Sequence, residues 1–220
     1  MEAKKLDYKK EDKALYSPWA KPSVIRVPSM NFIMVDGKGN PNTEGGEYQQ
    51  AVELLYALSY TIKMGYKNIE KPDGYSDYVV PPLEGLWWLE NGAAAESDFS
   101  QKEKYFWTSM IRQPEFVTRE VFERACREVV RKKPELDPTK ARLETLEEGL
   151  CVQIMHLGPY DEEPKSIAVM DSFIEKSSYQ NAIGDTRPDG AVRRHHEIYL
   201  GDPRKTEPSK MRTILRHPIK

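Results

Sequence analysis

The 220-residue sequence has few of the features that mark several large classes of protein. Two cysteines, Cys126 and Cys151, are too few for a disulfide framework, so we expect both to be small core residues. No apolar run has membrane-spanning length, and the charged start, MEAKKLDYKKEDK, holds no signal-peptide apolar core. We therefore expect a cytoplasmic protein with no membrane partner.

Basic runs, metal-binding spacings and nucleotide motifs are also missing. Lys+Arg 33 balance Asp+Glu 35 to a net charge of −2, which argues against a nucleic-acid partner. The histidines lack metal spacing, since His195 and His196 point to opposite faces of a strand. The turn GKGN (37–40) is no phosphate loop, and no G-x-S-x-G elbow occurs. We expect neither a metal nor a cofactor.

Hydrophobic periodicity predicts an α+β domain over residues 23–220, behind an N-terminal arm (1–22). In the arm, Pro18 and Pro22 favour an extended chain that contacts the body through Tyr16 and Trp19. The predicted strands are 23–40, 78–91, 104–114, 149–160, 195–203 and 211–220, and the predicted helices are 47–66, 118–133 and 164–176.

The order of these elements repeats. Strand, helix, strand, strand occurs over about 23–117 and again over about 143–220, joined by a linking helix, 118–133. Three short echoes keep the same order: NFIMVDGKG with VQIMHLGPY, LWWLEN with EIYLGD, and MIRQP with ILRHP. We expect duplicated modules in an antiparallel sheet, with helices on one face, the opposite face open, and a central ligand cleft.

The stretch RRHHEIYLGDP (193–203) places a glutamate inside a strand pattern. Alternation puts Ile198 and Leu200 on one face, which we assign to the helices, and Glu197 and Tyr199 on the other, with His195. A half-buried carboxylate is costly unless it is paired or functional. Glu197 is therefore the leading candidate for the charged group of the cleft.

Aromatic candidates for the cleft come from the repeat. It aligns Trp88 with Tyr199, which predicts that Trp88 faces the same way as Glu197 while Trp87 packs inward. We also favour Trp107, and Met155 as an adaptable pocket residue. Aromatic walls attract flat or cationic rings, and a glutamate among them can pair with a cation or act as a general base.

Structural roles remain open for the same residues. Glu197 could form an ion pair with Arg112, Arg193 or Arg216. The aromatic candidates and Met155 could be ordinary packing residues.

The sequence resembles the GyrI-like small-molecule-binding family. The resemblance is carried by PSVIRVPSMNFIMVDGKGNPN (22–42), YVVPPLEGLWW (78–88), CVQIMHLGPYDEEP (151–164) and HHEIYLGDPRKTEPSKMRTILRHPIK (195–220). It implies the duplicated fold with a central cleft, and it assigns cationic or aromatic ligands to Glu197. Some members are effector domains joined to helix-turn-helix DNA-binding regions. Residues 1–22 are too short to form a DNA-binding region, so we do not expect a transcription factor.

The chain is similar to the stand-alone subfamily of cyclopropanoid cyclopropyl hydrolases, which detoxify DNA-alkylating natural products in an aromatic cage. That resemblance implies a hydrolase in which Glu197 and Tyr199 are catalytic and Trp88, Trp107, Tyr199 and Glu197 bind substrate, with Met155 added from the repeat. The alternative is a non-catalytic module that sequesters or senses hydrophobic or cationic small molecules. A protein-interaction role is a third hypothesis, for which the sequence identifies no surface.

Overall fold

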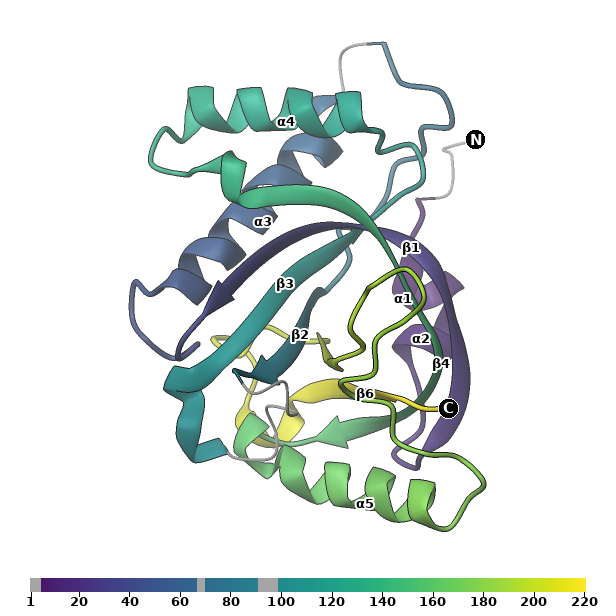
Figure 1. The fold of residues 1–220 in the computed structure, drawn as a ribbon. Coiled ribbons are helices and arrows are strands. Elements are labelled where there is room, and N and C mark those ends of the chain that lie inside the picture. The colour runs from purple at the N-terminus through teal and green to yellow at the C-terminus, as the bar shows by residue number, and fades with distance from the viewer. Residues whose placement is uncertain (1–4, 67–69, 91–98) are drawn as a thin grey trace.

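Six antiparallel strands form the centre of the computed structural model, which describes residues 5–66, 70–90 and 99–220 (Figure 1). The strands are β1 (Ser23–Lys38), β2 (Leu83–Leu89), β3 (Tyr105–Gln113), β4 (Ala141–Leu157), β5 (His195–Tyr199) and β6 (Arg212–Pro218). Each predicted strand corresponds to one of them, although residue 91 of the predicted second strand lies outside the described part. The α+β class and the antiparallel sheet are confirmed.

The sheet closes on itself, which the sequence did not predict. The strand order is β1-β3-β2-β5-β6-β4, and β4 pairs back with β1 from Ser23↔Gln153 to Val35↔Ala141. Closure depends on the length of β4, which begins at Ala141 rather than near residue 149. A closed barrel leaves no free sheet edge, whereas the sequence predicted an antiparallel sheet without predicting its closure.

Three long helices follow the predicted pattern: α3 (Glu47–Gly65), α4 (Arg119–Lys132) and α5 (Glu163–Glu175). The apolar stripe of α3 is buried, and Thr118 caps α4 by accepting a hydrogen bond from the Val121 amide. Pro164 lies in the first turn of α5, where its missing N–H costs nothing. No helix in the described ranges is long and apolar enough to cross a membrane.

Short 3₁₀ turns complete the chain at Phe99–Lys104, Pro138–Lys140, Tyr160–Glu162 and Pro208–Lys210. The order strand, helix, strand, strand occurs on both sides of α4. The internal duplication itself stays a prediction.

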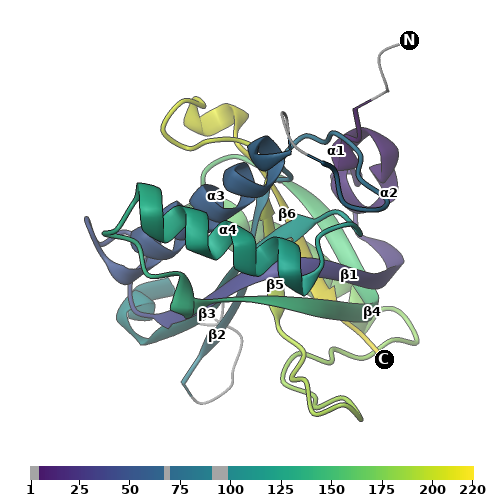
Figure 2. The ribbon, with the colours of Figure 1, turned by 90° about the horizontal axis from the view of Figure 1, so that it is seen from above.

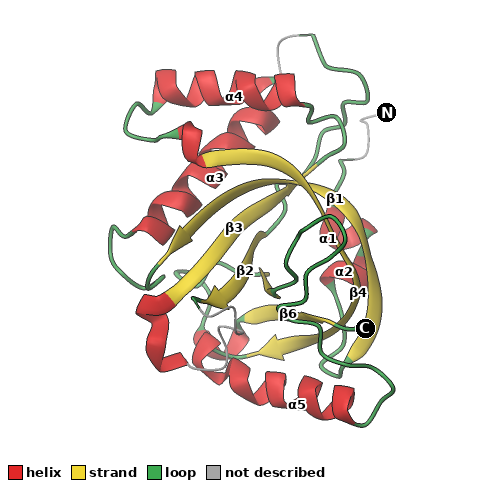
Figure 3. Ribbon diagram, viewed as in Figure 1, coloured by secondary structure: helices red, strands yellow, loops and turns green. Residues whose placement is uncertain are grey.

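The three long helices cover the outside of the barrel (Figures 2 and 3). Helices α3 and α4 pack on Ile33, Trp107 and Ile111, while α5 packs on Ile154 and Leu215. These two apolar clusters hold the helices at different places on the outer surface. The surface between them is where β2 and β5 run side by side.

The N-terminal arm packs on the opposite face of the sheet. Its helices α1 (Tyr8–Glu11) and α2 (Lys13–Tyr16) bury Tyr8, Leu15 and Tyr16 against Phe32 and Met110. The predicted extended chain is wrong here because Asp7 caps α1 with its side chain and the prolines come only after residue 17. Tyr16 contacts the body as predicted, but Trp19 is 82% exposed. The face expected to be open is therefore filled.

Candidate functional site

A cleft lies on the helix-covered side of the barrel, between the starts of α3 and α5. Its volume is about 1720 Å³, larger than the roughly 300–1,000 Å³ usual for small-ligand pockets. One end is lined by aromatic and acidic side chains from α3, β2, β5, the turn before α5 and the first residue of α5: Tyr48, Trp87, Tyr160, Glu163, Glu197 and Tyr199. This end combines flat apolar walls with carboxylates.

Glu197 is held at this end by two neighbours on its own strand. The Tyr199 hydroxyl donates to Glu197 Oε2 at 2.7 Å, and His195 Nε2 lies 3.0 Å from Oε1. Trp87 Nε1 in turn donates to the Tyr199 hydroxyl at 2.9 Å. The Glu197 side chain stays 15% exposed. The alternation of β5 therefore brings Glu197, Tyr199 and His195 together as predicted, with the carboxylate open to the cleft.

The cleft tyrosines are held as neutral phenols. Burial, followed by the charge of Glu197, raises the pKa of Tyr199 well above its usual value. The same two causes, in the same order, raise the pKa of Tyr48. Burial and then Glu163 raise the pKa of Tyr160, whose ring lies edge-on to Tyr199 at 5.7 Å. All three keep their protons at neutral pH; the Tyr199 proton is donated to Glu197, while Tyr48 and Tyr160 can donate hydrogen bonds to a ligand.

The two tryptophans of β2 exchange the places predicted for them. Gly85 pairs with Glu197 and Trp87 with His195, so Trp87 shares the face of Glu197. Trp88 lies on the opposite face, stacked on Phe106. The expectation that Trp88 faces Glu197 is wrong because aligning LWWLEN with EIYLGD shifted the strand by one residue, and one residue reverses the face.

Gly85 makes room for this arrangement. A Cβ at that position would lie 2.7 Å from Trp87 Nε1 and 3.3 Å from the Tyr199 hydroxyl. A side chain there would push apart Trp87 and the Tyr199 hydroxyl, and it is this hydroxyl that donates to Glu197. Only glycine fits beside the carboxylate, and the sequence pattern gave no sign of this role.

Trp107 shares the face of Trp87 but lies beneath Tyr48, whose ring meets it edge-on at 5.2 Å. Its side chain is fully buried, and its ring fits against Gly37, where a Cβ would lie 2.2 Å away. Trp107 therefore supports the wall of the cleft from behind. Tyr48, which the sequence analysis did not select, supplies the wall itself.

Met155 lies away from the cleft. It pairs with Ile214 and packs with the apolar cluster that holds the N-terminal arm. Ile214 also pairs with Ile198, so this group faces away from Glu197. The assignment of Ile198 to the helix-covered side is reversed as well, because α3, α4 and α5 lie on the face of Glu197 while α1 and α2 cover Ile198.

The arginines considered as partners for Glu197 bind other groups. Arg112 pairs with Asp12 at 2.6 Å, and Arg216 with Glu148 at 2.7 Å. Arg193 donates to backbone oxygens, including that of Leu150 at 2.6 Å. Within the described residues, Glu197 instead contacts His195 and Tyr199, so a structural ion pair with one of these arginines does not explain it.

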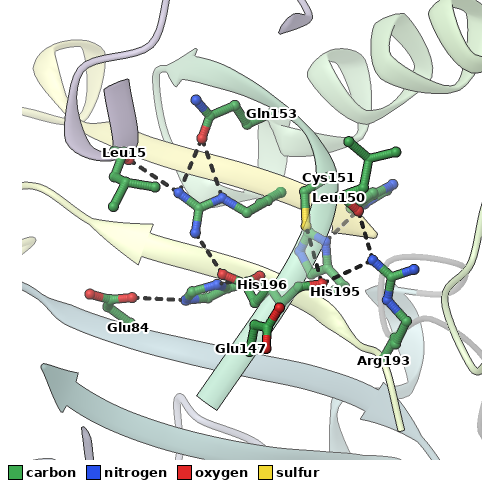
Figure 4. A network of polar contacts seen from close by, with 12 residues as sticks. Leu15, Glu84, Glu147, Leu150, Cys151, Gln153, Arg193, His195 and His196 are labelled. Carbon is green, nitrogen blue, oxygen red and sulfur yellow. Dashed lines mark hydrogen bonds and ion pairs between the residues drawn. The ribbon is translucent and has the colours of Figure 1, made fainter. Parts of the chain in front are cut away.

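Arg216 belongs to a charged cluster with Glu148 and His196 on the other face of the sheet. Figure 4 shows His196 and Glu84 of this cluster. His196 lies 3.0 Å from both Glu84 and Glu148. Burial alone would lower the pKa of His196, but Glu148 and Glu84 outweigh it and raise that pKa to about 9. Burial likewise opposes the shift of Glu148, whose pKa His196 and Arg216 lower to about 2. His196, Glu148 and Arg216 are therefore charged at neutral pH, and the cluster is separate from the cleft.

No group of three or more metal-ligating side chains gathers among the described residues. The barrel and its aromatic, acidic cleft define a domain built to hold a small molecule. The chain belongs to the GyrI-like family, because the profile of the GyrI-like small molecule binding domain matches residues 20–220.

Solved structures agree with this family. An uncharacterized conserved protein from Listeria innocua is 51% identical with a TM-score of 0.88, over 98% of this chain and 100% of that one. A hydrolase from Listeria innocua is 50% identical with a TM-score of 0.84, over 98% and 100% of the chains. A hydrolase encoded by lin2189 from the same organism is 49% identical with a TM-score of 0.86, over 99% and 100%. A search of curated proteins found no match.

Proposed function

We propose that the cleft binds flat aromatic or cationic xenobiotics and that Glu197 directs water onto the strained ring of cyclopropanoid compounds. The observation that carries this proposal is the Glu197 carboxylate, fixed by Tyr199 and His195 yet open to an aromatic cleft. Two relatives of about half identical sequence are named hydrolases, which supports a hydrolytic reaction. Such a reaction would protect a cell from DNA-alkylating compounds of this class.

The reaction balances without a cofactor. Glu197 takes a proton from water, and the water oxygen bonds to the cyclopropane methylene carbon. The electron pair of the broken carbon–carbon bond moves through the ring to the dienone oxygen, which takes up a proton and becomes a phenol. The neutral phenols of Tyr48 and Tyr160, which also line the cleft, supply O–H donors to that oxygen as its charge develops. Ring strain drives the opening, so general-base help of about 10²–10⁴ is sufficient.

The test is incubation with a cyclopropane-fused dienone, followed by mass spectrometry for the product that has gained one water. Glu197→Gln keeps the shape of the side chain but cannot take a proton, so the rate should fall about 10²–10⁴-fold. Glu162→Gln, an exposed glutamate in the turn before α5, is the matched control and should retain the rate. A fully active Glu197→Gln variant would refute the assigned role.

The second candidate is binding without chemistry. Two carboxylates, Glu163 and Glu197, line the aromatic end of the cleft, which favours a cationic ring. Affinity for a cationic dye should then fall in Glu197→Gln, while affinity for a neutral analogue should not change. Equal losses for both ligands would count against charge recognition.

A further inference from the structure

Glu197 is the inner end of a row of polar side chains that runs from the cleft to α5. His195 Nε2 lies 3.0 Å from Glu197 Oε1, and His195 Nδ1 lies 2.9 Å from His217 Nε2. His217 Nδ1 lies 3.9 Å from Asp171 Oδ1 on α5. The two histidines are 1% exposed, and Asp171 is 48% exposed. The row thus joins the cleft carboxylate to the surface beneath buried rings.

The carboxylate sets the direction of every hydrogen bond in the row. An ionised glutamate only accepts, so His195 must donate from Nε2, and a neutral imidazole then has a bare Nδ1. His217 then donates its Nε2–H to the bare Nδ1 of His195. The remaining nitrogen, His217 Nδ1, is then the place where a further proton binds, on the side facing Asp171.

We propose that His195 and His217 are positioning residues for Glu197, and that protonation of His217 switches off its action as a base. The proposal rests on the function proposed for Glu197. An imidazolium at His217 donates more strongly to His195, which then donates more strongly to the carboxylate. A carboxylate held in this way takes a proton from water less readily.

Within the described part of the chain, several elements pack against His217. His195 comes from β5 and Asp171 from α5, while β4 pairs the uncharged Val152 with His217. Arg193, in the loop before β5, donates to the backbone oxygen of Ile219 rather than to the ring. The rings of His195 and His217 meet edge-on at 4.9 Å between centroids, which suits an in-plane N–H···N bond. Asp171 is thus a charged partner of His217 that a surface variant can remove.

The first test needs no substrate. Nitrogen-15 NMR distinguishes protonated from bare ring nitrogens, and above the range where histidine takes up its second proton we expect Nε2–H with a bare Nδ1 on both His195 and His217. His195→Gln and His217→Gln assign the signals. The opposite tautomer on either histidine would overturn the inference, whether or not the cleft performs hydrolysis.

The second test is the pH profile of kcat/KM for ring opening. Glutamine at position 217 keeps an N–H donor but does not titrate, so His217→Gln should move the acid limb down by at least about half a pH unit. The alkaline plateau should stay within about threefold of the wild type. Asp171→Asn should also move the acid limb of kcat/KM to lower pH, and it does so without altering a buried residue. Glu175→Gln removes the same charge one turn further along α5 and should move nothing.

The outcomes separate the two proposals. An acid limb unchanged in both His217→Gln and Asp171→Asn overturns the switch while the base role of Glu197 stands. Full activity in Glu197→Gln overturns the base role instead. If His217→Gln fails to fold, the surface variant Asp171→Asn still decides the question.

Discussion

At the scale of single residues, two adjacent tryptophans of β2 separate the cleft from the other face of the sheet. Trp87 donates to Tyr199 in the cleft, whereas Trp88 stacks on Phe106. Trp87→Leu should weaken binding of a flat cationic dye about tenfold, or ~1.4 kcal/mol, since a wall and a donor are both lost. Trp88→Leu, the matched control, should bind within about twofold. Fluorescence titration measures both affinities, and equal losses would contradict the assignment of the two faces.

The site could be predicted from the sequence only in part. Alternation within β5 was enough to group Glu197 with Tyr199 and His195, because that grouping needs no other strand. Trp87 required the register between β2 and β5, which letter similarity misaligned by one residue. His217 required the pairing of β5 with β6, and Tyr48 required the packing of α3 on the barrel. These relations depend on tertiary contacts that no local pattern contains.

At the scale of elements, the N-terminal arm is attached by polar contacts as well as apolar ones. Asp12 pairs with Arg112, the Tyr16 hydroxyl donates to Glu84, and Arg216 donates to the Leu15 carbonyl. Arg112 and Arg216 are the two arginines matched by the predicted repeat, and both hold this arm.

Breaking one of these contacts should loosen the arm before the barrel. In Asp12→Asn the partly buried Arg112 loses its carboxylate partner, so we expect tryptic cleavage within residues 5–13 to become several-fold faster. Mass spectrometry of timed digests identifies the cut sites. Asp73→Asn, an exposed aspartate outside the arm, should digest like the wild type. Unchanged cleavage in Asp12→Asn would mean that apolar packing alone holds the arm.

The elements themselves were predictable where apolar periodicity is strong. The stripe of α3 and the N-cap of α4 were visible in the sequence. The first half of β4, ARLETLEE, was missed because glutamates are poor strand formers and leave no apolar alternation. That polar half pairs with β1 from Ile33↔Leu143 to Ser29↔Glu147. Barrel closure therefore depends on backbone pairing, which composition does not report.

At the scale of the whole molecule, the charged cluster around His196 should set how stability depends on pH. The folded pKa of His196 is about 9, above its ordinary 6.5, so its contribution is complete below about pH 6.5 and is lost as pH rises towards 9. The folded pKa of Glu148 is about 2, below its ordinary 4.5, so its contribution is lost as pH falls from 4.5 towards 2. Both are complete between about pH 4.5 and 6.5.

Calorimetry should therefore show Tm falling between pH 6.5 and 9 in the wild type. His196→Gln should be less stable by about 3–5 kcal/mol, because Glu84 and Glu148 lose a buried cationic partner. In this variant the decrease in Tm between pH 6.5 and 9 should be much smaller than in the wild type. His156→Gln is the control, since His156 is also buried but binds Ser166 and the Pro159 carbonyl. A wild-type Tm that stays flat to pH 9 would show that His196 is not charged in the folded protein.

The strand order also has a consequence for how the protein is made. The last strand, β6, lies between β5 and β4, so every earlier strand leaves the ribosome while the barrel still has a gap. Until residues 212–218 appear, β4 and β5 each present an unpaired edge, and the Leu15 carbonyl lacks its hydrogen bond from Arg216. Unpaired edges are sites of misassembly. A growing chain of this protein is therefore most dependent on chaperones just before residues 212–218 appear.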